Sequence, residues 1–436
     1  MDSNSITFDD LLPELKDNIF EYFHGKELLN LSLVCHAWYD HMAYSKMCMN
    51  KIKIKVRGKY RVISMENKEL LKYSKRQYQR FDAGSCWKQM DNIIDILSGP
   101  GHPWRIVHFE DLKFITNQDF EKCLTGIEET IQELKFVNVG IHRPSSYRTD
   151  YFFPNLTVLK LHNCDWSLNE PFMYATQIRE LYLSHYRPID NIETFQRIMT
   201  LNANLKSLSL PVHCFDSLVQ KEVTDGLTFQ IRNLIVTNIV RPNEYGSSKS
   251  NLAYFLKSQT SIKKLEIEEW MGLEVLVTIF KHLRILEKLI LMKIQECEEN
   301  IDWKTLTLKP HYRLADLEYQ DMKSNPDIFN TLVEAAENLK ILDVFAITQV
   351  MLDKSIYKLQ NLEHLAVGRL DIRQVTHKNI LLKLKSIRCN AYDISLQTNL
   401  EKKTKARRSY FENILFDNSE GRVTDFYLYN FVRLER

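Results

Sequence analysis

A pattern of three apolar positions, L-x-x-L-x-L or a conservative variant of it, recurs through most of the chain. The last two apolar residues of each copy alternate with other residues, as Leu159 and Leu161 do around Lys160. This alternation predicts a short β-strand with one buried face, because successive side chains of a strand point to opposite sides. The central apolar positions of the eleven clearest copies are Leu134, Leu159, Leu181, Leu208, Leu234, Leu265, Leu289, Leu317, Leu342, Leu365 and Ile387.

These central positions span 253 residues in ten intervals, so one repeat averages about 25 residues. The stretches between them, such as 191–201 and 327–336, read as helices that return the chain. A single unit cannot bury its apolar face alone, but stacked units share one continuous core. The spacing resembles that of leucine-rich repeats, whose units have roughly 20–29 residues. We therefore predict an α/β fold, a curved leucine-rich-repeat solenoid with parallel strands on its concave face and helices on its convex face.

The solenoid is expected to fill residues 51–436 with about 11–14 irregular repeats, which are clearest over 131–390. The alternative interpretation is an ordinary α/β sheet in which the leucine spacing is coincidental. Further strands are expected around Ile54, around Val107 and Phe109, and around Phe426 and Leu428, with helices at 68–77 and 87–97.

The first 50 residues follow a different pattern, with apolar residues at spacings of three and four. Pro13 suits the first turn of a helix, where its missing N–H has no partner to lose. Leu15, Ile19 and Phe23 then form one apolar stripe, and a second helical stretch runs from Leu28. Two or three short helices cannot bury so many apolar side chains by themselves, so we expect a partner to cover part of this surface.

These N-terminal residues resemble the F-box motif. The resemblance rests on L-P-E-L at 12–15, I-F at 19–20, E-L at 27–28, L-V-C at 33–35 and Trp38. In the F-box family such helices dock onto a Skp-type adaptor, which joins them to a cullin scaffold. The alternative interpretation is a helical cap for the solenoid.

The resemblance places an F-box at residues 6–50. It departs from the family pattern at 45–48, where S-K-M-C replaces the Leu-Trp pair that often closes the motif. The residues that the resemblance assigns to adaptor binding are Leu12, Pro13, Leu15, Ile19, Leu28, Leu31, Val34 and Trp38.

Composition and charge narrow the range of functions. Hydrophobic residues make up 44% and charged residues 26% of the chain, which is ordinary for a folded soluble protein. The formal net charge of +2 argues against a protein built to hold a nucleic-acid backbone. The polar start of the chain lacks signal-peptide features, and no apolar stretch reaches the roughly 18 residues of a membrane helix. We therefore expect a cytoplasmic or nuclear protein that binds neither nucleic acid nor membrane.

No group of residues in the sequence predicts catalysis, a metal site or a cofactor. The eight cysteines form no C-x-x-C pair, and the histidines lack the spacing of metal ligands. His213 and Cys214 are adjacent, but catalytic Cys–His pairs are brought together by the fold, so we interpret Cys214 as a buried structural residue. The basic run at 402–408 is interpreted as a solvated loop, with a nuclear-import signal as the alternative.

An F-box followed by leucine-rich repeats is a recognised protein class. The resemblance to this class implies that the repeats select a substrate and that the F-box links it to the ligase, while catalysis belongs to other subunits. We expect the substrate-recognition subunit of an SCF (Skp-cullin-F-box) ubiquitin ligase, which promotes ubiquitination and degradation of a bound protein. The alternative is a leucine-rich-repeat scaffold that binds protein partners without ligase activity.

The residues between the inward-pointing leucines should face the concave surface. Along the chain this surface passes from basic to acidic, with apolar side chains among the later carboxylates. We expect a substrate with a basic segment and an apolar anchor, held by repeats between 262 and 346 unless the C-terminal tail or nearby loops cover them. The expected substrate-binding residues are Tyr182, Glu266, Ile290, Met292, Glu318, Asp343 and Phe345.

Overall fold

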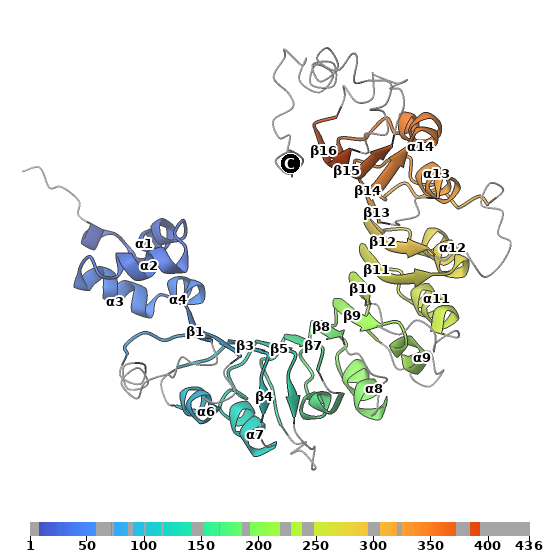
Figure 1. Ribbon diagram of the computed structural model, residues 1–436. Helices are drawn as coiled ribbons and strands as arrows, with labels where there is room; N and C mark the ends of the chain where they lie inside the picture. Colours follow the sequence, from blue (N-terminus) through green and yellow to red (C-terminus); the bar gives the residue numbers. More distant parts are fainter. Residues whose placement is uncertain are drawn as a thin grey trace, which may run out of the picture. The chain divides into compact units, whose positions relative to one another are not determined.

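The computed structural model divides the chain into two compact units (Figure 1). Unit 1 contains residues 1–207 and 221–229, and unit 2 contains residues 208–220 and 230–436. The structure describes residues 8–57, 71, 74–85, 90–99, 102–114, 117–141, 151–164, 166–184, 192–218, 228–237, 248–294, 306–320, 325–371 and 384–392.

Unit 1 begins with a block of short helices, and Pro13 starts the first of them as predicted. The rings of Phe8 and Trp38 pack against Phe20 at centroid distances of 5.4 and 5.5 Å, and Phe20 is fully buried. Aromatic packing therefore holds this small block together. Its elements are η1 (Phe8–Asp10), α1 (Pro13–Phe20), α2 (Gly25–Leu31), α3 (His36–Tyr44) and α4 (Lys46–Lys51).

Short parallel strands follow in unit 1, and each pairs in register with the next. Leu134 on β5 lies opposite Leu159 on β7, which in turn lies opposite Leu181 on β8. The predicted leucines therefore form columns across the sheet. The strands are β1 (Lys53–Arg57), β2 (Arg80–Gly84), β3 (Ile106–Glu110), β5 (Glu133–Val137), β7 (Val158–His162) and β8 (Glu180–Ser184), with a separate pair β4 (Lys113–Phe114) and β6 (Gly140–Ile141).

Unit 2 repeats the arrangement, and five of its strands, β11, β12, β14, β15 and β16, are longer than those of unit 1. The same columns continue there, since Leu265 on β11 lies opposite Leu289 on β12 and Leu317 on β13 lies opposite Leu342 on β14. Strand β9 (Ser207–Pro211) begins at Ser207, which belongs to unit 1, and its other residues belong to unit 2. The strands of unit 2 are β10 (Asn233–Thr237), β11 (Lys264–Met271), β12 (Lys288–Ile294), β13 (Asp316–Tyr319), β14 (Ile341–Thr348), β15 (His364–Asp371) and β16 (Ser386–Tyr392).

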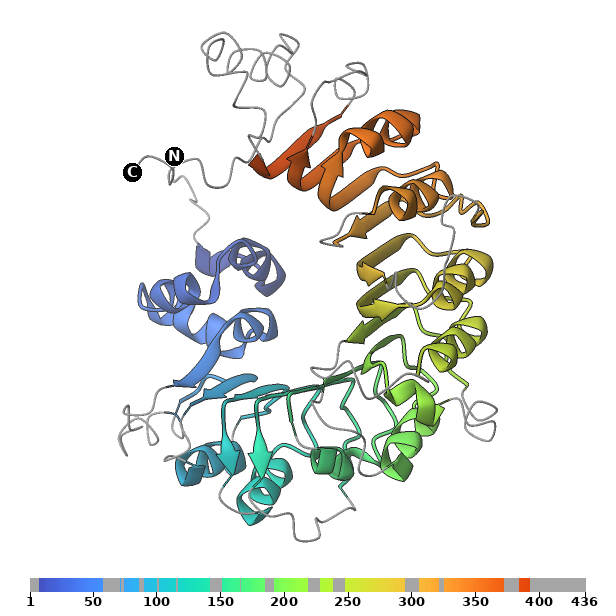
Figure 2. The same ribbon diagram turned by 45° about the vertical axis from the view of Figure 1, so that its right-hand side comes forward.

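Within each unit the helices lie along one face of the sheet (Figures 1 and 2). The central leucines point toward this face and are buried, whereas the residues between them are half-buried, as the alternating burial of β5, β7 and β8 shows. We call the helix-free side of each sheet its open face. The helices are α6 (Met90–Ser98), α7 (Asn117–Thr125), η3 (Trp166–Phe172) and α8 (Ile192–Leu201) in unit 1, and α9 (Cys214–Leu218), α11 (Ser248–Ser258), α12 (Leu273–His282), α13 (Pro326–Glu334), α14 (Gln349–Lys354) and η4 (Ile356–Lys358) in unit 2.

The α/β repeat architecture, with parallel strands and helices on one side, is confirmed. The helices predicted at 87–97, 191–201 and 327–336 appear as α6, α8 and α13, with shifted ends. The basic run at 402–408, the strand expected around Phe426 and Leu428, and half of the helix expected at 68–77 lie outside the described residues.

Four strands of unit 1 end in a residue with left-handed backbone geometry. Ser85, Asp111, Asn138 and Asn163 follow β2, β3, β5 and β7 and have φ values of 51° or 52°. The N–H of each donates to a carbonyl at the end of the next strand, for example Asn138 to His162 at 2.9 Å. Asn138 also donates from its side chain to Asp111 at 2.8 Å. Short polar residues tolerate the left-handed conformation. Their backbone hydrogen bonds join the carboxyl ends of neighbouring strands.

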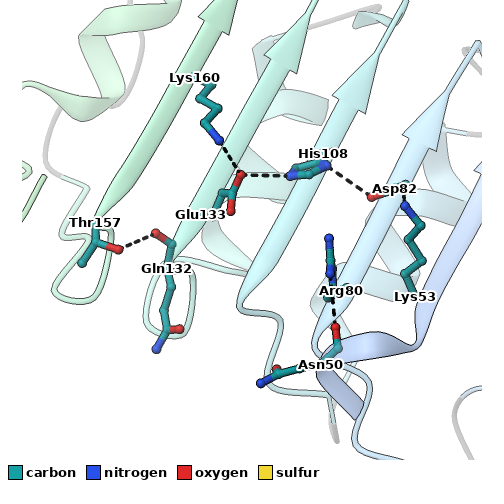
Figure 3. Close-up of polar contacts among 9 residues, drawn as sticks. All are labelled: Asn50, Lys53, Arg80, Asp82, His108, Gln132, Glu133, Thr157 and Lys160. Atoms are coloured by element: carbon teal, nitrogen blue, oxygen red, sulfur yellow. Dashed lines mark hydrogen bonds and ion pairs between the residues drawn. The ribbon is translucent and has the colours of Figure 1, made fainter. Parts of the chain in front are cut away.

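Charged side chains on the open face of unit 1 form a ladder from β1 to β7 (Figure 3). Asp82 on β2 contacts Lys53 Nζ at 3.0 Å and His108 Nδ1 at 3.4 Å. Glu133 on β5 contacts His108 Nε2 at 3.4 Å and Lys160 Nζ at 3.0 Å. Cations and anions thus alternate across five neighbouring strands, in the order Lys53, Asp82, His108, Glu133, Lys160.

The ladder shifts the pKa values of Glu133, Asp82 and His108 toward their charged forms. Hydrogen bonding to His108, together with Lys160, lowers the pKa of Glu133 to about 2, although burial acts against this. Burial also opposes ionisation of Asp82, but His108 and Lys53 outweigh it, and the pKa of this carboxyl lies well below its usual range. Burial likewise lowers the pKa of His108, but the two carboxylates outweigh it and raise that pKa above its usual value.

We predict that His108→Gln destabilises unit 1 most in mildly acidic solution. The raised pKa of His108 means that its stabilising charge is fully present below the unfolded-state pKa of about 6.5 and is lost as the pH rises through the folded-state pKa. The depressed pKa values of Asp82 and Glu133 keep both carboxylates charged down to below about pH 4. The loss in unfolding free energy should be about 1 kcal/mol near pH 5.5 and smaller near pH 8.5, measured by urea denaturation.

His162→Gln provides a control, because folding lowers the pKa of His162 whereas it raises the pKa of His108. Burial, Lys135 and Lys160 lower the pKa of His162, so its neutral form is favoured by folding and any contribution fades as the pH falls below about 6.5. A larger loss for His108→Gln at high pH than at low pH would contradict the assignment of a charged imidazolium between Asp82 and Glu133.

Candidate functional site

Helix α1 presents a row of apolar side chains to solvent. Leu12 is 65% exposed, and Leu15, Ile19 and Tyr22 are also exposed. Leu15 and Ile19 lie one turn apart on α1, Leu12 is the N-cap of this helix, and Tyr22 lies two residues beyond its end. We call these four residues the α1 stripe. A contiguous apolar row on an otherwise packed small domain indicates a protein-binding surface.

A second exposed apolar group lies in the turn between α2 and α3. Leu33 is 80% exposed and Val34 is 64% exposed. Leu31 and Trp38, on either side of this turn, are half-buried and pack against the core of the block. Leu33 and Val34 therefore form a second apolar surface, which we call the 33–34 turn.

Polar contacts hold α1 against α3 and α4. One carboxylate oxygen of Asp17 lies 2.8 Å from His41 Nε2 and accepts a hydrogen bond from Ser45 Oγ at 2.7 Å. Ser45 Oγ in turn accepts from the backbone N–H of Cys48 at 3.1 Å and so caps α4. This network fixes the helix that carries the α1 stripe, so the stripe is held in place before any partner binds.

Gly25, at the start of α2, allows the helices to come close together. A Cβ atom at this position would lie 2.2 Å from the backbone carbonyl oxygen of Lys51 at the end of α4. Backbone cannot yield as a flexible side chain can, so α2 and α4 can meet here only at a glycine.

The prediction that Leu28 contacts the adaptor directly is wrong. Leu28 is fully buried, in the same cluster as Phe20, Met42 and Cys48. The spacing of three that suggested a surface anchor is also the spacing of a residue that points into the core of the block. Leu28 supports the docking helices from inside and offers no surface to a partner.

The helical block is packed onto the first repeat. Arg76, which lies before strand β2, donates to Ser32 Oγ at 2.6 Å and stacks over the ring of Tyr39 at 4.9 Å. The N–H of Gln77 donates to the carbonyl of Ala43 at 3.4 Å. The segment that leads into β2 thus joins α2 and α3 to the sheet of unit 1.

The charged ladder on the open face of unit 1 pairs its own carboxylates with cations (Figure 3). Tyr182 closes this row: Lys160 Nζ lies 5.4 Å from its ring centroid, and its hydroxyl donates to Glu180 at 3.2 Å. Tyr182, which the sequence analysis proposed for substrate binding, is therefore half-buried and already engaged by two neighbours.

The open face of unit 2 carries two neighbouring carboxylates that form no ion pair with any described residue. Glu318 on β13 and Asp343 on β14 are register partners, and the side-chain amide of Gln320 lies 3.4 and 2.9 Å from their carboxylates. Burial and the nearby charge of Asp343 raise the pKa of Glu318 above its usual value. This pair is therefore a surface where a cationic side chain would be stabilised.

The remaining residues proposed for substrate binding divide into two groups. Met292 and Phe345 are half-buried on the open face of unit 2. Glu266 is also half-buried, but it forms an ion pair with Lys264 at 3.2 Å. The expectation that Ile290 faces solvent is wrong, because only 6% of its surface is exposed.

Sequence reasoning missed three parts of these surfaces. Tyr22 lies two residues beyond the end of α1, so helical spacing does not predict its place in the α1 stripe. Leu33 lies beside the predicted Val34. Gln320, which bridges the two carboxylates, directly follows the last residue of β13, Tyr319. It lies outside the L-x-L pattern, so the pattern gives no reason to select it.

The described part of the chain contains no group of three or more His, Cys, Asp or Glu side chains that could hold a metal ion. His213 and Cys214 are both buried, and Cys214 is fully enclosed at the start of α9. Among the described helices, none has the length and apolar character needed to cross a bilayer.

Comparison with known proteins identifies the helical block. Residues 8–47 match the family model of the F-box domain. No curated protein sequence matches the chain.

Solved structures give only distant similarities. The crystal structure of the Rad7 and Elc1 complex in yeast matches over 78% of this chain and 84% of that chain, at 13% identity and a TM-score of 0.39. The TLR13–ssRNA13 complex matches over 83% of this chain and 61% of that chain, at 14% identity and a TM-score of 0.37. The plant peptide hormone receptor RGFR1 in complex with RGF2 matches over 72% of this chain and 46% of that chain, at 10% identity and a TM-score of 0.25. At these identities and TM-scores, none of the three bears on the function of this chain.

The matched domain coincides with the helices that carry the α1 stripe and the 33–34 turn. The parallel strands that follow repeat the L-x-L pattern in register. The chain is therefore an F-box protein with leucine-rich repeats.

Proposed function

We propose that this protein is the substrate-recognition subunit of a Skp-cullin-F-box ubiquitin ligase. The observation that carries the proposal is the exposed apolar surface of the matched F-box domain, made of the α1 stripe and the 33–34 turn. In this proposal a Skp-type adaptor covers that surface and links the chain to a cullin. The chain itself catalyses no step, and it acts in the cytoplasm or the nucleus.

The adaptor-binding role falls on residues that are exposed in the free chain. Large apolar side chains that enter a partner's pockets carry most of the energy of an interface. Leu12, Leu15 and Ile19 on α1 and Val34 in the turn meet this condition, because the aromatic core behind them holds their backbone in place. Trp38 and Leu31 contribute from beneath, through the packing of the block.

The repeats are the proposed substrate-binding part, and their open face in unit 2 is the favoured surface. Glu318 and Asp343 supply negative charge and form no ion pair with any described residue, and half-buried Met292 and Phe345 supply apolar area. Charge complementarity of this kind sets orientation and association rate, while apolar contact adds affinity. We propose a substrate segment with a basic side chain next to an apolar one.

The first prediction for this function concerns the adaptor. Leu15→Ala combined with Ile19→Ala should weaken binding to a Skp-type adaptor by roughly 30-fold or more, since each anchor typically contributes about 1–2 kcal/mol. Binding is measured by calorimetry with the purified adaptor. The fold should be retained, because both side chains are exposed in the free chain.

Two further variants separate docking from folding. Val350→Ala removes an exposed apolar side chain from α14 and should leave adaptor binding unchanged. Leu28→Ala empties a fully buried site and should lower the stability of the F-box by about 2–5 kcal/mol. Unchanged adaptor affinity in the Leu15–Ile19 double variant would show that α1 is not the docking helix.

The second prediction concerns the substrate. Glu318→Lys combined with Asp343→Lys should abolish capture of most substrate proteins, because the reversed charges repel a basic segment. The measurement is quantitative proximity labelling in cells, made in a background where the Leu15–Ile19 substitutions prevent degradation. Adaptor affinity of the charge-reversal variant, measured with α1 intact, should be unaltered.

The neutral pair Glu318→Gln and Asp343→Asn should weaken capture less than the reversal does. Glu129→Lys, which reverses an exposed charge in a turn of unit 1, serves as the matched control. An unaltered set of labelled proteins in the folded double reversal would place the substrate site elsewhere.

A further inference from the structure

Beyond the last described strand, the sequence contains a segment with the chemistry expected of a ligand for the open face of unit 2. Strand β16 ends at Tyr392, and residues 393–436 lie outside the described residues. Residues 402–411 read K-K-T-K-A-R-R-S-Y-F, with five cations, no acidic side chain and two aromatic rings at the end. We call residues 402–411 the basic segment. It combines positive charge with adjacent apolar side chains, the two features that the proposed substrate segment also has.

The open face of unit 2 has two carboxylates that such a segment can bind. Glu318 and Asp343 are register partners on β13 and β14 and form no ion pair with any described residue. Burial and the charge of Asp343 raise the pKa of Glu318, and Lys288, which acts in the opposite direction, is itself paired with Asp316 at 2.7 Å. A further cation beside Glu318 and Asp343 would therefore stabilise both carboxylates in their charged form.

Apolar side chains lie beside these carboxylates at a spacing that the basic segment repeats. Met292 on β12 and Phe345 on β14 are half-buried on the same face. Phe345 follows Asp343 by two residues on one strand, so both side chains point to the same side, about 6–7 Å apart along the strand. In the basic segment, Arg408 and Tyr410 have the same separation. In an extended conformation the segment can therefore place a cation beside Asp343 and an aromatic ring beside Phe345 at the same time.

Strand β15, which lies between β14 and β16, has small residues next to this site. Ala366 is the register partner of Asp343. Gly368 lies next to Phe345: a Cβ atom there would be 2.6 Å from the carbonyl oxygen of Phe345, so the two strands can approach this closely only at a glycine. Because neither position carries a bulky side chain, a segment that comes from β16 can cross β15 close to the sheet.

The basic segment follows β16 closely enough in the sequence to reach the two carboxylates. Asp343 is in register with Ala366, which is in register with Arg388, four residues before the end of β16. Neighbouring strands lie about 4.8 Å apart and successive residues of a strand about 3.3 Å apart, so the carboxylate pair lies roughly 20 Å from Tyr392. Residues 393–401 can span up to about 30 Å when extended. The connection is therefore long enough.

Other parts of unit 2 would repel the basic segment. Arg284 and Lys309 line a depression at the amino ends of β12 and β13. Lys257 and Lys281 lie near the carboxyl ends of α11 and α12. The pKa of His282 is lowered by burial and then by all four of these cations, which shows that their charges act on one place. Since like charges repel, the open face is the favoured place for the basic segment.

We propose that the basic segment docks on the open face of unit 2 and competes there with the substrate. Its two arginines bind Glu318 and Asp343, and Tyr410 packs beside Phe345. This inference rests on the substrate surface proposed above, but not on the proposed ligase role. Because the segment is attached by a short connection, it competes at an effective concentration on the order of millimolar. Only a substrate segment that binds more tightly than the chain's own segment then gains access to the surface.

The test measures binding of a fluorescein-labelled synthetic peptide with the sequence of residues 402–411 to the full-length protein, by fluorescence anisotropy. In the wild type the attached segment competes with the peptide. Arg407→Glu combined with Arg408→Glu in the full-length chain removes this competitor and should lower the Kd of the peptide about tenfold. Adding Glu318→Lys and Asp343→Lys to that variant should abolish binding. The neutral pair Glu318→Gln and Asp343→Asn, which preserves side-chain size, should weaken binding less.

Two controls separate docking from a general effect of charge. Lys257→Glu combined with Lys281→Glu makes the same change in net charge on the helices of unit 2 and should leave the Kd at the wild-type value. A peptide with serine in place of Tyr410 and Phe411 keeps all five cations and should bind several-fold more weakly, because it loses the apolar contact. The melting temperature of each protein variant shows that it is folded.

Three outcomes would overturn the proposal. Equal peptide affinity in the wild type and in the Arg407–Arg408 variant would show that the attached segment does not compete, although the acidic surface would stand. Absence of binding to the Arg407–Arg408 variant, or binding that survives both changes of Glu318 and Asp343, would show that the segment does not dock there. Substrate capture and adaptor affinity are measured separately, as described above, so failure of the proposed function is distinguishable from failure of this inference.

Discussion

The structure depends on one constraint: a strand of five residues with an L-x-L core cannot bury its own apolar face. Each repeat completes its neighbour's core, so the leucine columns must stay in register across the sheet, as Leu134, Leu159 and Leu181 do. Buried polar side chains reinforce that stacking. Asn202 and Gln259 accept hydrogen bonds from backbone N–H groups of the preceding repeat, and His311 contacts a carbonyl of the preceding repeat. In these three pairs of neighbouring repeats, the loop before one strand is therefore hydrogen-bonded to the loop before the preceding strand.

The same constraint separates structural from functional side chains. Because leucines fill one face of each strand, the residues between them are free to vary without loss of core. In unit 1 this freedom produces a self-paired charge ladder from Lys53 to Lys160. In unit 2 it leaves Glu318 and Asp343 without an ion pair to any described residue. The F-box differs from the repeats, because its buried aromatic core supports apolar side chains that are exposed to solvent.

The spacing of apolar residues predicted the repeats and the helical block. An element buried on one face has apolar residues at every second position in a strand and at a period of about 3.6 residues in a helix. It could not tell Leu28 from Leu15, since both lie at helical spacing and only packing decides which one points inward. Nor could it assign Asn202 or His311, polar residues that are buried because their partners come from another repeat. The pairing of Asp82 with His108, and the convergence of Arg284 with Lys309, depend on strand register and loop course, which no local pattern contains.

The central claim is that the F-box joins these repeats to a ubiquitin ligase. The most direct measurement is reconstitution of the full-length chain with a purified Skp-type adaptor and cullin, followed by size-exclusion chromatography with light scattering. The account predicts one stable complex that contains a single copy of each component and that forms only when residues 8–47 are present. Elution of this chain apart from the adaptor and cullin, with or without its F-box, would contradict the account and leave a repeat protein that binds partners outside the ligase.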